Sequence, residues 1–320
     1  MEIDKSSKVI VLPRLSPEKD LIEYKVVDLP IATLSSTKPY LITTQEVYEL
    51  NTIKGDDSKV KLSNGEAVKS IILEPQDHDI PGAVIQSGDV ILATKFNIVY
   101  LLISIFDRHL SKFRNFKTLE DIKDSLSSIV EEYSWIYDIP DTVYYRSLPV
   151  ICDQIIEGND EKFYKYSNEK SMSWVNDKIE AMSKFVREEK GNSILKRINM
   201  ELNDPTNIES KVDTDVLQST ITRYSIDFIC DSYLIPDIKP KLINQFKYDF
   251  TKMEKYLLGL SQKRKNLEAV EANMSDVNRI TSNTKSNSNS NSRKQAMVKK
   301  KATNKVAVGK GALDGFFKRA

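Results

Sequence analysis

One stretch, residues 88–110, most constrains the fold because its apolar residues change period within it. Residues 90–93 form a short apolar run entered through a Gly-Asp pair, a pattern typical of a strand. From Ile98 onward the apolar residues fill both sides of a helical repeat, which indicates a buried helix. This helix is too short to cross a bilayer and ends in a charged Asp-Arg pair. We therefore expect a β-rich part to end here and a helical part to begin.

The residues before this joint predict a small barrel or sandwich. Short apolar runs separated by turn residues lie at 9–12, 21–27, 41–43, 46–50, 60–62 and 70–73. The Asn64-Gly65 pair indicates a tight hairpin, which needs positive φ angles. Few of these runs alternate cleanly, so we expect an incomplete sheet whose open edges need cover from a partner chain or a loop. An independent small β-domain is the plainer alternative.

The residues after the joint predict a helical domain. Thr118 and Asp121 form a capping-box pair at the start of an amphipathic segment. Ser167 can cap a second helix with one apolar stripe, formed by Met172, Val175, Ile179, Met182 and Val186. Residues 187–213 are polar and loop-like, and further helices are expected around 217–233, from Pro240 and from Thr251. Periodicity alone does not select a winged helix over a bundle.

An aromatic and basic segment, residues 163–166, permits two interpretations. Phe163, Tyr164 and Tyr166 interleaved with Lys165 are able to stack on single-stranded nucleic acid and contact its phosphates. Aromatic residues beside a capped helix more often pack into a core while the lysine stays in solvent. We favour the core interpretation.

The charge of the chain is strongly divided although the net charge is only +1. Residues 262–320 carry 14 Lys and Arg against four Asp and Glu, whereas the preceding 261 residues carry nine more acids than bases. Residues 281–291 contain no hydrophobic residue and predict a linker. The cluster Lys299, Lys300 and Lys301 is interpreted as a nuclear-import signal, a nonspecific DNA contact or a solvated charge run.

The end of the chain carries an apolar face that has no neighbours to bury it. Leu313, Phe316 and Phe317 share one helical turn, which is typical of a helix that anchors in a groove. The spacing resembles the box with which proteins dock on the sliding clamp PCNA, with Lys310 at the position of the usual glutamine. This resemblance implies a clamp tether at the tip of a basic tail.

No pattern in the sequence supports catalysis, and we predict no catalytic, metal-binding or cofactor-binding residue. Phosphate-binding loops, His-Glu-x-x-His and nucleophile-elbow motifs are missing from the sequence. Cys152 and Cys230 lie far apart, and the start of the sequence lacks the features of a signal peptide. We therefore expect an intracellular protein, with no membrane partner, whose two thiols are reduced core residues.

Two stretches resemble the noncatalytic B-type subunit of the eukaryotic type 2 ribonuclease H. The joint shares a threonine and a leucine pair with the family at Thr94, Leu101 and Leu102, although Lys95 and Ile98 replace its prolines. The longer match follows the family's tyrosine-rich pattern at Tyr164, Lys165, Tyr166, Ser167, Glu169, Lys170, Trp174 and Lys178.

The resemblance implies an α+β protein organised in five parts. These are a half-barrel shared with a partner subunit at 1–92, a winged-helix-like domain at 93–250, an extended helix at 251–275, a disordered basic linker at 276–308 and the clamp-binding box at 309–320. The implied function is that of a noncatalytic nuclear subunit. Its implied partners are the catalytic A-type subunit, the C-type subunit and PCNA, with an RNA/DNA hybrid reached through the complex. A stand-alone, clamp-tethered DNA-binding adaptor is the alternative.

Overall fold

The computed structural model describes most of the chain, with gaps. The described ranges are 2–4, 8–12, 24–31, 36–54, 70–75, 81–85, 88–128, 135–158, 160–189, 192–207 and 212–285. The contacts divide the chain into two compact units, the first formed by Met1–Lys178 with Ile229–Gln245 and the second by Ile179–Phe228 with Phe246–Ala320. No helix within these described ranges has the length and apolar character needed to cross a membrane.

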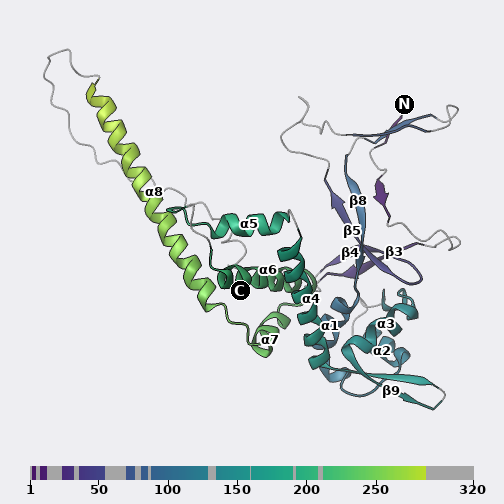
Figure 1. The fold of residues 1–320 in the computed structure, drawn as a ribbon. Helices are drawn as coiled ribbons and strands as arrows, with labels where there is room; N and C mark the ends of the chain where they lie inside the picture. The colour runs from purple at the N-terminus through teal and green to yellow at the C-terminus, as the bar shows by residue number, and fades with distance from the viewer. Residues whose placement is uncertain are drawn as a thin grey trace, which may run out of the picture. The chain divides into compact units, whose positions relative to one another are not determined.

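The first unit begins with a five-stranded sheet in the order β2-β8-β5-β4-β3 (Figure 1). Its strands are β2 Val9–Val11, β3 Lys25–Pro30, β4 Thr37–Ile42, β5 Val47–Ile53 and β8 Val90–Phe96. Three neighbouring pairs are antiparallel, while β2 runs parallel to β8. The apolar run at residues 90–93 is therefore the start of β8, a central strand that is paired on both sides.

A second, three-stranded sheet has the order β1-β7-β6. It consists of β1 Glu2–Asp4, β6 Ile71–Leu73 and β7 Ala83–Ile85, and β1 pairs with β7 in parallel. The predicted strands near residues 9, 41, 46 and 70 are confirmed, whereas β1 and β7 were not predicted. The predicted strand at 60–62 and the Asn64-Gly65 hairpin lie outside the described residues.

Helices follow directly after β8, as the change of period predicts. The elements are α1 Val99–Arg108, the short 3-10 helix η1 Leu110–Lys112, α2 Leu119–Ser127, α3 Asp141–Ile151 and the hairpin β9 Cys152–Glu157 with β10 Glu161–Tyr166. An isolated bridge joins Lys117 to Tyr164 beside the hairpin. Three helices, a bridging residue between the first two and a terminal hairpin form the arrangement of a winged helix.

Local signals explain why these helices start and pack where they do. The Thr118 side chain accepts from the Asp121 backbone N–H at 3.1 Å and Asp121 reciprocates, so the predicted capping box is confirmed. On α1, Leu102, Ile103 and Ile105 are completely buried, which confirms the prediction of a helix covered on all sides. The apolar residues of α1 therefore belong to the core of the winged helix.

The segment at residues 163–166 belongs to the hairpin of this winged helix. Tyr164 and Tyr166 are buried, and the Phe106 ring packs edge-on against Tyr166 at 5.6 Å. The Lys165 ammonium lies 5.7 Å from the centre of the Phe116 ring. The core interpretation is therefore confirmed for the two tyrosines, which are not available for stacking on bases.

The second unit is helical. The chain runs through α4 Asn168–Glu188, α5 Ser193–Leu202, α6 Thr214–Tyr233, α7 Ile238–Gln245 and α8 Thr251–Lys285, of which α7 belongs to the first unit and α4 and α6 contribute to both. The prediction of a polar loop over 187–213 is wrong because α5 forms inside it. The Asn192 side chain accepts from the Ile194 backbone N–H and caps this helix.

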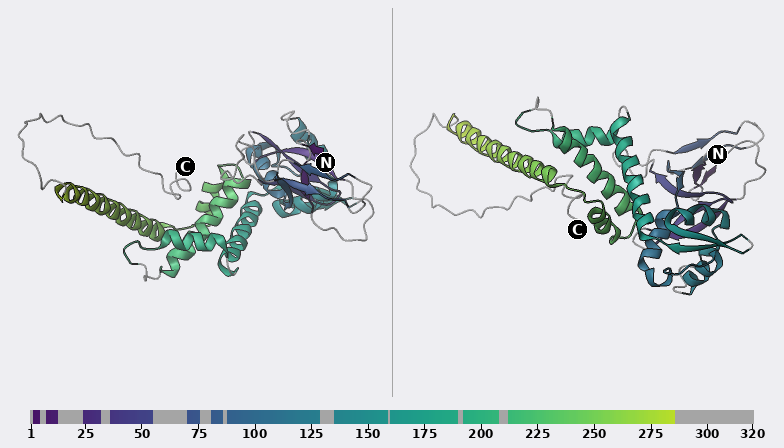
Figure 2. Two further views of the ribbon diagram at one scale, coloured as in Figure 1. Left: turned by 90° about the horizontal axis from the view of Figure 1, so that it is seen from above. Right: turned by 60° about the horizontal axis from the view of Figure 1, so that its bottom comes forward.

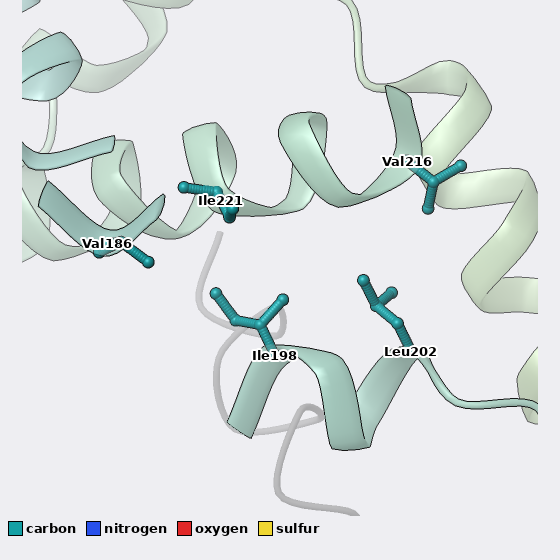
Figure 3. Close-up of a cluster of buried hydrophobic side chains, with 5 residues drawn as sticks. All are labelled: Val186, Ile198, Leu202, Val216 and Ile221. Atoms are coloured by element: carbon teal, nitrogen blue, oxygen red, sulfur yellow. The ribbon is translucent and has the colours of Figure 1, made fainter. Parts of the chain in front are cut away.

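A small core holds α5 against its neighbours. Figure 3 shows Ile198 and Leu202 of α5 pointing toward Val216 and Ile221 of α6, with Val186 of α4 beside them. All five side chains are buried. Their burial offsets the ordering cost of a ten-residue helix that is too short to be stable alone.

The first turns of α8 are bound to the same unit, and its later turns extend past it (Figure 2). Tyr256 donates to the Leu202 carbonyl at 2.9 Å, Arg264 donates to the Glu201 carbonyl at 2.6 Å, and Lys263 pairs with Asp204. The helix continues to Lys285, so it includes the start of the stretch expected to be a linker. Residues 286–320 lie outside the described residues.

Candidate subunit interface

A polar row crosses the middle of one face of the five-stranded sheet. Residues paired in register share a face, so Glu49 of β5 lies beside Thr94 of β8. Lys38 donates to Glu49 at 2.6 Å and to Asn51 at 3.1 Å, and Asn51 donates to the Thr94 hydroxyl at 2.9 Å. These bonds satisfy the polar groups within the sheet and fix its register.

The two sides of this polar row differ in how well they are covered. Toward the helices, the Tyr40 and Phe96 rings pack 4.8 Å apart, and Phe96 lies 6.2 Å from the Tyr233 ring. On the other side, Val11 is exposed and Ile53 retains 56% of its exposure. The sheet is therefore sealed where it meets the helices and open at the opposite end.

The outer strands of the sheet also expose apolar side chains. Val26 of β3 is 58% exposed although its neighbour in the sheet, Leu41, is buried. Ile10 of β2 is 43% exposed on the opposite edge. Within the described ranges, no strand pairs with the outer edge of β3. Unpaired backbone groups beside exposed apolar residues make an edge that favours addition of another strand.

The three-stranded sheet also exposes apolar side chains on an outer strand. Ile85 of β7 is buried, whereas Ile72 and Leu73 of the outer strand β6 are exposed. Fully burying one such side chain contributes about 1.5–3 kcal/mol. The exposed apolar residues of both sheets, which we call the open strand surface, are Ile10, Val11, Leu12, Val26, Ile53, Ile72 and Leu73.

Polar contacts join the sheet to α3 of the winged helix. Thr142 donates to the Thr44 carbonyl at 2.6 Å, and Arg146 donates to the Gln45 carbonyl at 2.7 Å and to Glu46 at 3.1 and 3.3 Å. Lys95 also donates to Glu46 at 2.9 Å. The helix that reads DNA bases in helix-turn-helix proteins corresponds to α3 here, and two of its polar residues, Thr142 and Arg146, bond to the sheet.

The charge of Glu46 is stabilised by this contact. Burial raises the pKa of the Glu46 carboxyl, but hydrogen bonds from Lys95 and Arg146 outweigh it, so the pKa lies below its usual value. The carboxylate therefore stays ionised over the physiological range and keeps both cations at the junction.

Two kinds of reactive group, metal-holding clusters and activated thiols, are missing from the described residues. No group of three or more His, Cys, Asp or Glu side chains gathers among them in a way that holds a metal ion. Both cysteines are free and buried, and burial raises the pKa of the Cys152 thiol to about 12. A thiol with that pKa is protonated at neutral pH and is a poor nucleophile.

The site residues predicted in the tail stay predictions. The import candidates Lys299, Lys300 and Lys301 and the clamp-binding residues Lys310, Leu313, Phe316 and Phe317 all lie outside the described residues.

Sequence reasoning predicted an incomplete sheet but did not identify the residues that form its open surface. The signal was available in β3, where Val26 and Val27 are adjacent apolar residues that must face opposite sides of a strand. Val27 is buried, and Val26 is left exposed. Strand pairing was needed to decide which of the two faces solvent.

The described residues define a class of protein in which an open β-sheet unit is followed by a winged helix. Two family descriptions match the chain in this order: the Ydr279p protein triple barrel domain over residues 11–97, and the Ydr279p protein family (RNase H2 complex component) wHTH domain over residues 100–243. The chain belongs to this family of RNase H2 complex components, which confirms the resemblance to the B-type subunit of that enzyme and the α+β fold class. No curated protein matches the chain significantly.

Proposed function

We propose that the protein is the noncatalytic structural subunit of the ribonuclease H2 heterotrimer. The assembled enzyme would degrade RNA in RNA/DNA hybrids and remove ribonucleotides misincorporated in DNA. The observation that carries this proposal is the open strand surface, because clustered exposed apolar residues beside strand edges mark a site of interaction with another chain.

The sheet of the first unit would bind one partner directly and help to support the other. The sheet would complete its barrel with strands of the C-type subunit, and the pair would support the catalytic A-type subunit, which holds the metals and the active site. The polar contacts of Thr142 and Arg146 with the sheet supply the rigidity that such a scaffold needs.

The direct test is co-expression of the full chain with and without the other two subunits. Alone and at high concentration, the chain is expected to aggregate through the open strand surface, and with its partners it is expected to elute as a soluble complex that cleaves hybrids. Mass spectrometry of the chains that copurify identifies them. A soluble, monomeric chain that binds neither of the other two subunits would refute the proposal.

The tail would tether the complex to the replication clamp in the nucleus. Replacing Phe316 and Phe317 by alanine should remove clamp binding, since these rings supply most of the apolar anchor. Hybrid cleavage by the complex should be unchanged, because the active site would lie on the catalytic subunit. Replacing Lys299, Lys300 and Lys301 by glutamine tests nuclear import through localisation of the tagged chain. Unchanged clamp affinity in the first variant would refute the tether, and an unchanged nuclear fraction in the second would refute the import signal.

One observation favours the alternative, a DNA-binding adaptor. Residues 108–117, with the sequence RHLSKFRNFK, carry four Lys or Arg and no acid, and Arg108, Lys112 and Arg114 are exposed. A DNA-binding role predicts nanomolar affinity of the chain for duplex DNA that falls steeply with salt. Replacing Arg108, Lys112 and Arg114 by glutamine would then abolish DNA binding. The proposal of a structural subunit predicts that the same replacement leaves assembly with the other subunits unchanged.

A further inference from the structure

A cavity of about 250 Å³ lies at the junction between the five-stranded sheet and the winged helix. Its walls come from the start of β5, the end of β8, the start of α1, one side of α3 and Trp174 of α4. All of these residues belong to the first unit. The cavity is separate from the open strand surface, since none of the exposed residues that define that surface lines it.

The walls of this cavity are mainly apolar. Val143 is buried in the wall, and Val150, seven residues further along α3, is exposed at its rim. The Trp174 ring is held edge-on to Tyr100 at 4.8 Å, and the Lys178 ammonium lies 5.1 Å from its centre. A fixed indole beside aliphatic walls suits an apolar or aromatic side chain.

The rim of the cavity carries more hydrogen-bond donors than Glu46, its one acidic residue, can accept. Lys95 and Arg146 both contact Glu46, and Arg146 also contacts the Gln45 carbonyl. An ammonium has three N–H donors and a guanidinium has five, so donors remain on both side chains. Lys95 and Arg146 are exposed. Among the described residues that line the cavity, these two are the cations and Glu46 is the anion. The rim is therefore net positive.

We propose that this junction cavity binds a peptide segment of a partner protein that presents one large apolar side chain next to a carboxylate. The apolar side chain enters between Val143, Val150 and Trp174, and the carboxylate accepts from Lys95 and Arg146. A segment seated there touches the sheet, α1, α3 and α4 together, so it locks the winged helix to the sheet.

The size of the cavity favours a peptide over a free small molecule. Cavities that enclose drug-sized ligands usually measure about 300–1,000 Å³. A volume of about 250 Å³ accommodates one anchoring side chain. A component of a protein complex also meets polypeptide partners by its nature, and the proposal does not depend on which of the partner chains supplies the segment.

The test uses the full chain labelled with 5-fluorotryptophan. The sequence has two tryptophans, so ¹⁹F NMR gives one signal from Trp174 at the cavity and one from buried Trp135 as an internal control. The probes are three blocked dipeptides: acetyl-Phe-Asp-amide, acetyl-Phe-Asn-amide and acetyl-Ala-Asp-amide. The Phe-Asp probe should shift the Trp174 signal saturably, the Phe-Asn probe should bind about threefold more weakly, and the Ala-Asp probe should not saturate.

Three variants identify the contacts. Val150→Phe fills the mouth of the cavity and should abolish binding of the Phe-Asp probe. Lys95→Gln should reduce its affinity part of the way toward that of the Phe-Asn probe, because Arg146 remains. Lys112→Gln, which removes an exposed charge that does not line the cavity, should have no effect. Equal affinity for the charged and uncharged probes, binding retained in Val150→Phe, or a shift of Trp135 without Trp174 would each overturn the proposal. These results are independent of whether the other two subunits of the enzyme assemble with the chain.

Discussion

The five-stranded sheet and the winged helix are adjacent parts of one unit, but they bury their apolar residues differently. In the winged helix, Leu102, Leu126 and Leu148 are completely buried by neighbouring helices of the same chain. In the sheet, Val26 and Ile53 retain more than half of their exposure. The helices of the winged helix bury these side chains within one chain, whereas no described element covers Val26 or Ile53 of the sheet. The difference separates residues that stabilise the fold from residues that stabilise an assembly.

The largest expected effect is a loss of stability in the winged helix. Leu102→Ala removes a completely buried side chain and should lower the free energy of unfolding by about 2–5 kcal/mol. Val26→Ala, an exposed position in β3, should change it by less than about 0.5 kcal/mol. Urea unfolding of both variants in the assembled complex and in the chain alone measures this contrast. If the two variants lost equal unfolding free energy in the chain alone, the contrast between the winged helix and the sheet would be contradicted.

The second prediction concerns assembly. A double variant, Val26→Asp with Ile53→Asp, places two charges on the open strand surface and should weaken copurification of the partner subunits at least about tenfold, because an interface core excludes unpaired charges. Met200→Asp is the matched control, since Met200 is 74% exposed but lies in the second unit. Loss of the partners in the control and not in the double variant would place the interface elsewhere.

The third prediction tests the local signal that starts α2. Thr118→Ala removes the hydroxyl that accepts from the Asp121 backbone N–H and should cost about 1 kcal/mol. Thr118→Ser keeps the hydroxyl and should cost much less. Thermal unfolding of the two variants compares them, and an equal loss in both would show that the capping box is not the cause.

The smallest expected effect is a pH dependence in the second unit. Hydrogen bonds from Lys263 and Thr206 lower the pKa of the Asp204 carboxyl from 3.8 to about 2. Because this pKa is lower in the folded chain, the stabilisation is present above pH 3.8 and is lost as the pH falls toward 2. Asp204→Asn should reduce the acid sensitivity of this unit slightly, and Asp177→Asn, an exposed control on α4, should not. Circular dichroism over this pH range measures both, and identical acid curves for Asp204→Asn and the wild type would exclude the contribution.

Local patterns were enough to predict several elements of the fold. The period change at Ile98 places α1 within one residue, and the Thr118 and Asp121 pair places the start of α2. The helix α5 was missed because the polar residues around it concealed a repeat of Ile194, Ile198 and Leu202 at spacings of four.

Contacts between distant residues were beyond sequence reasoning. The parallel pairing of β1 with β7 joins residues about 80 positions apart, and nothing in either three-residue strand specifies its partner. The junction cavity likewise needs β8, α3 and α4 to converge, although nothing in the sequence around Arg146 or Trp174 indicates a shared site. The family resemblance predicted the class of fold, but it did not identify these contacts.

Hydrogen–deuterium exchange of the edge strands tests the central claim most directly. The amides of β3 residues 25–29 are measured in the full chain alone and in the complex with the partner subunits, with α1 residues 99–108 as the internal reference. For the β3 amides that do not bond to β4, the open-sheet account predicts fast exchange in the chain alone and strong slowing in the complex. It predicts slow exchange in α1 in both states. Equal protection of β3 with and without partners would show that the sheet is already complete and would contradict the account.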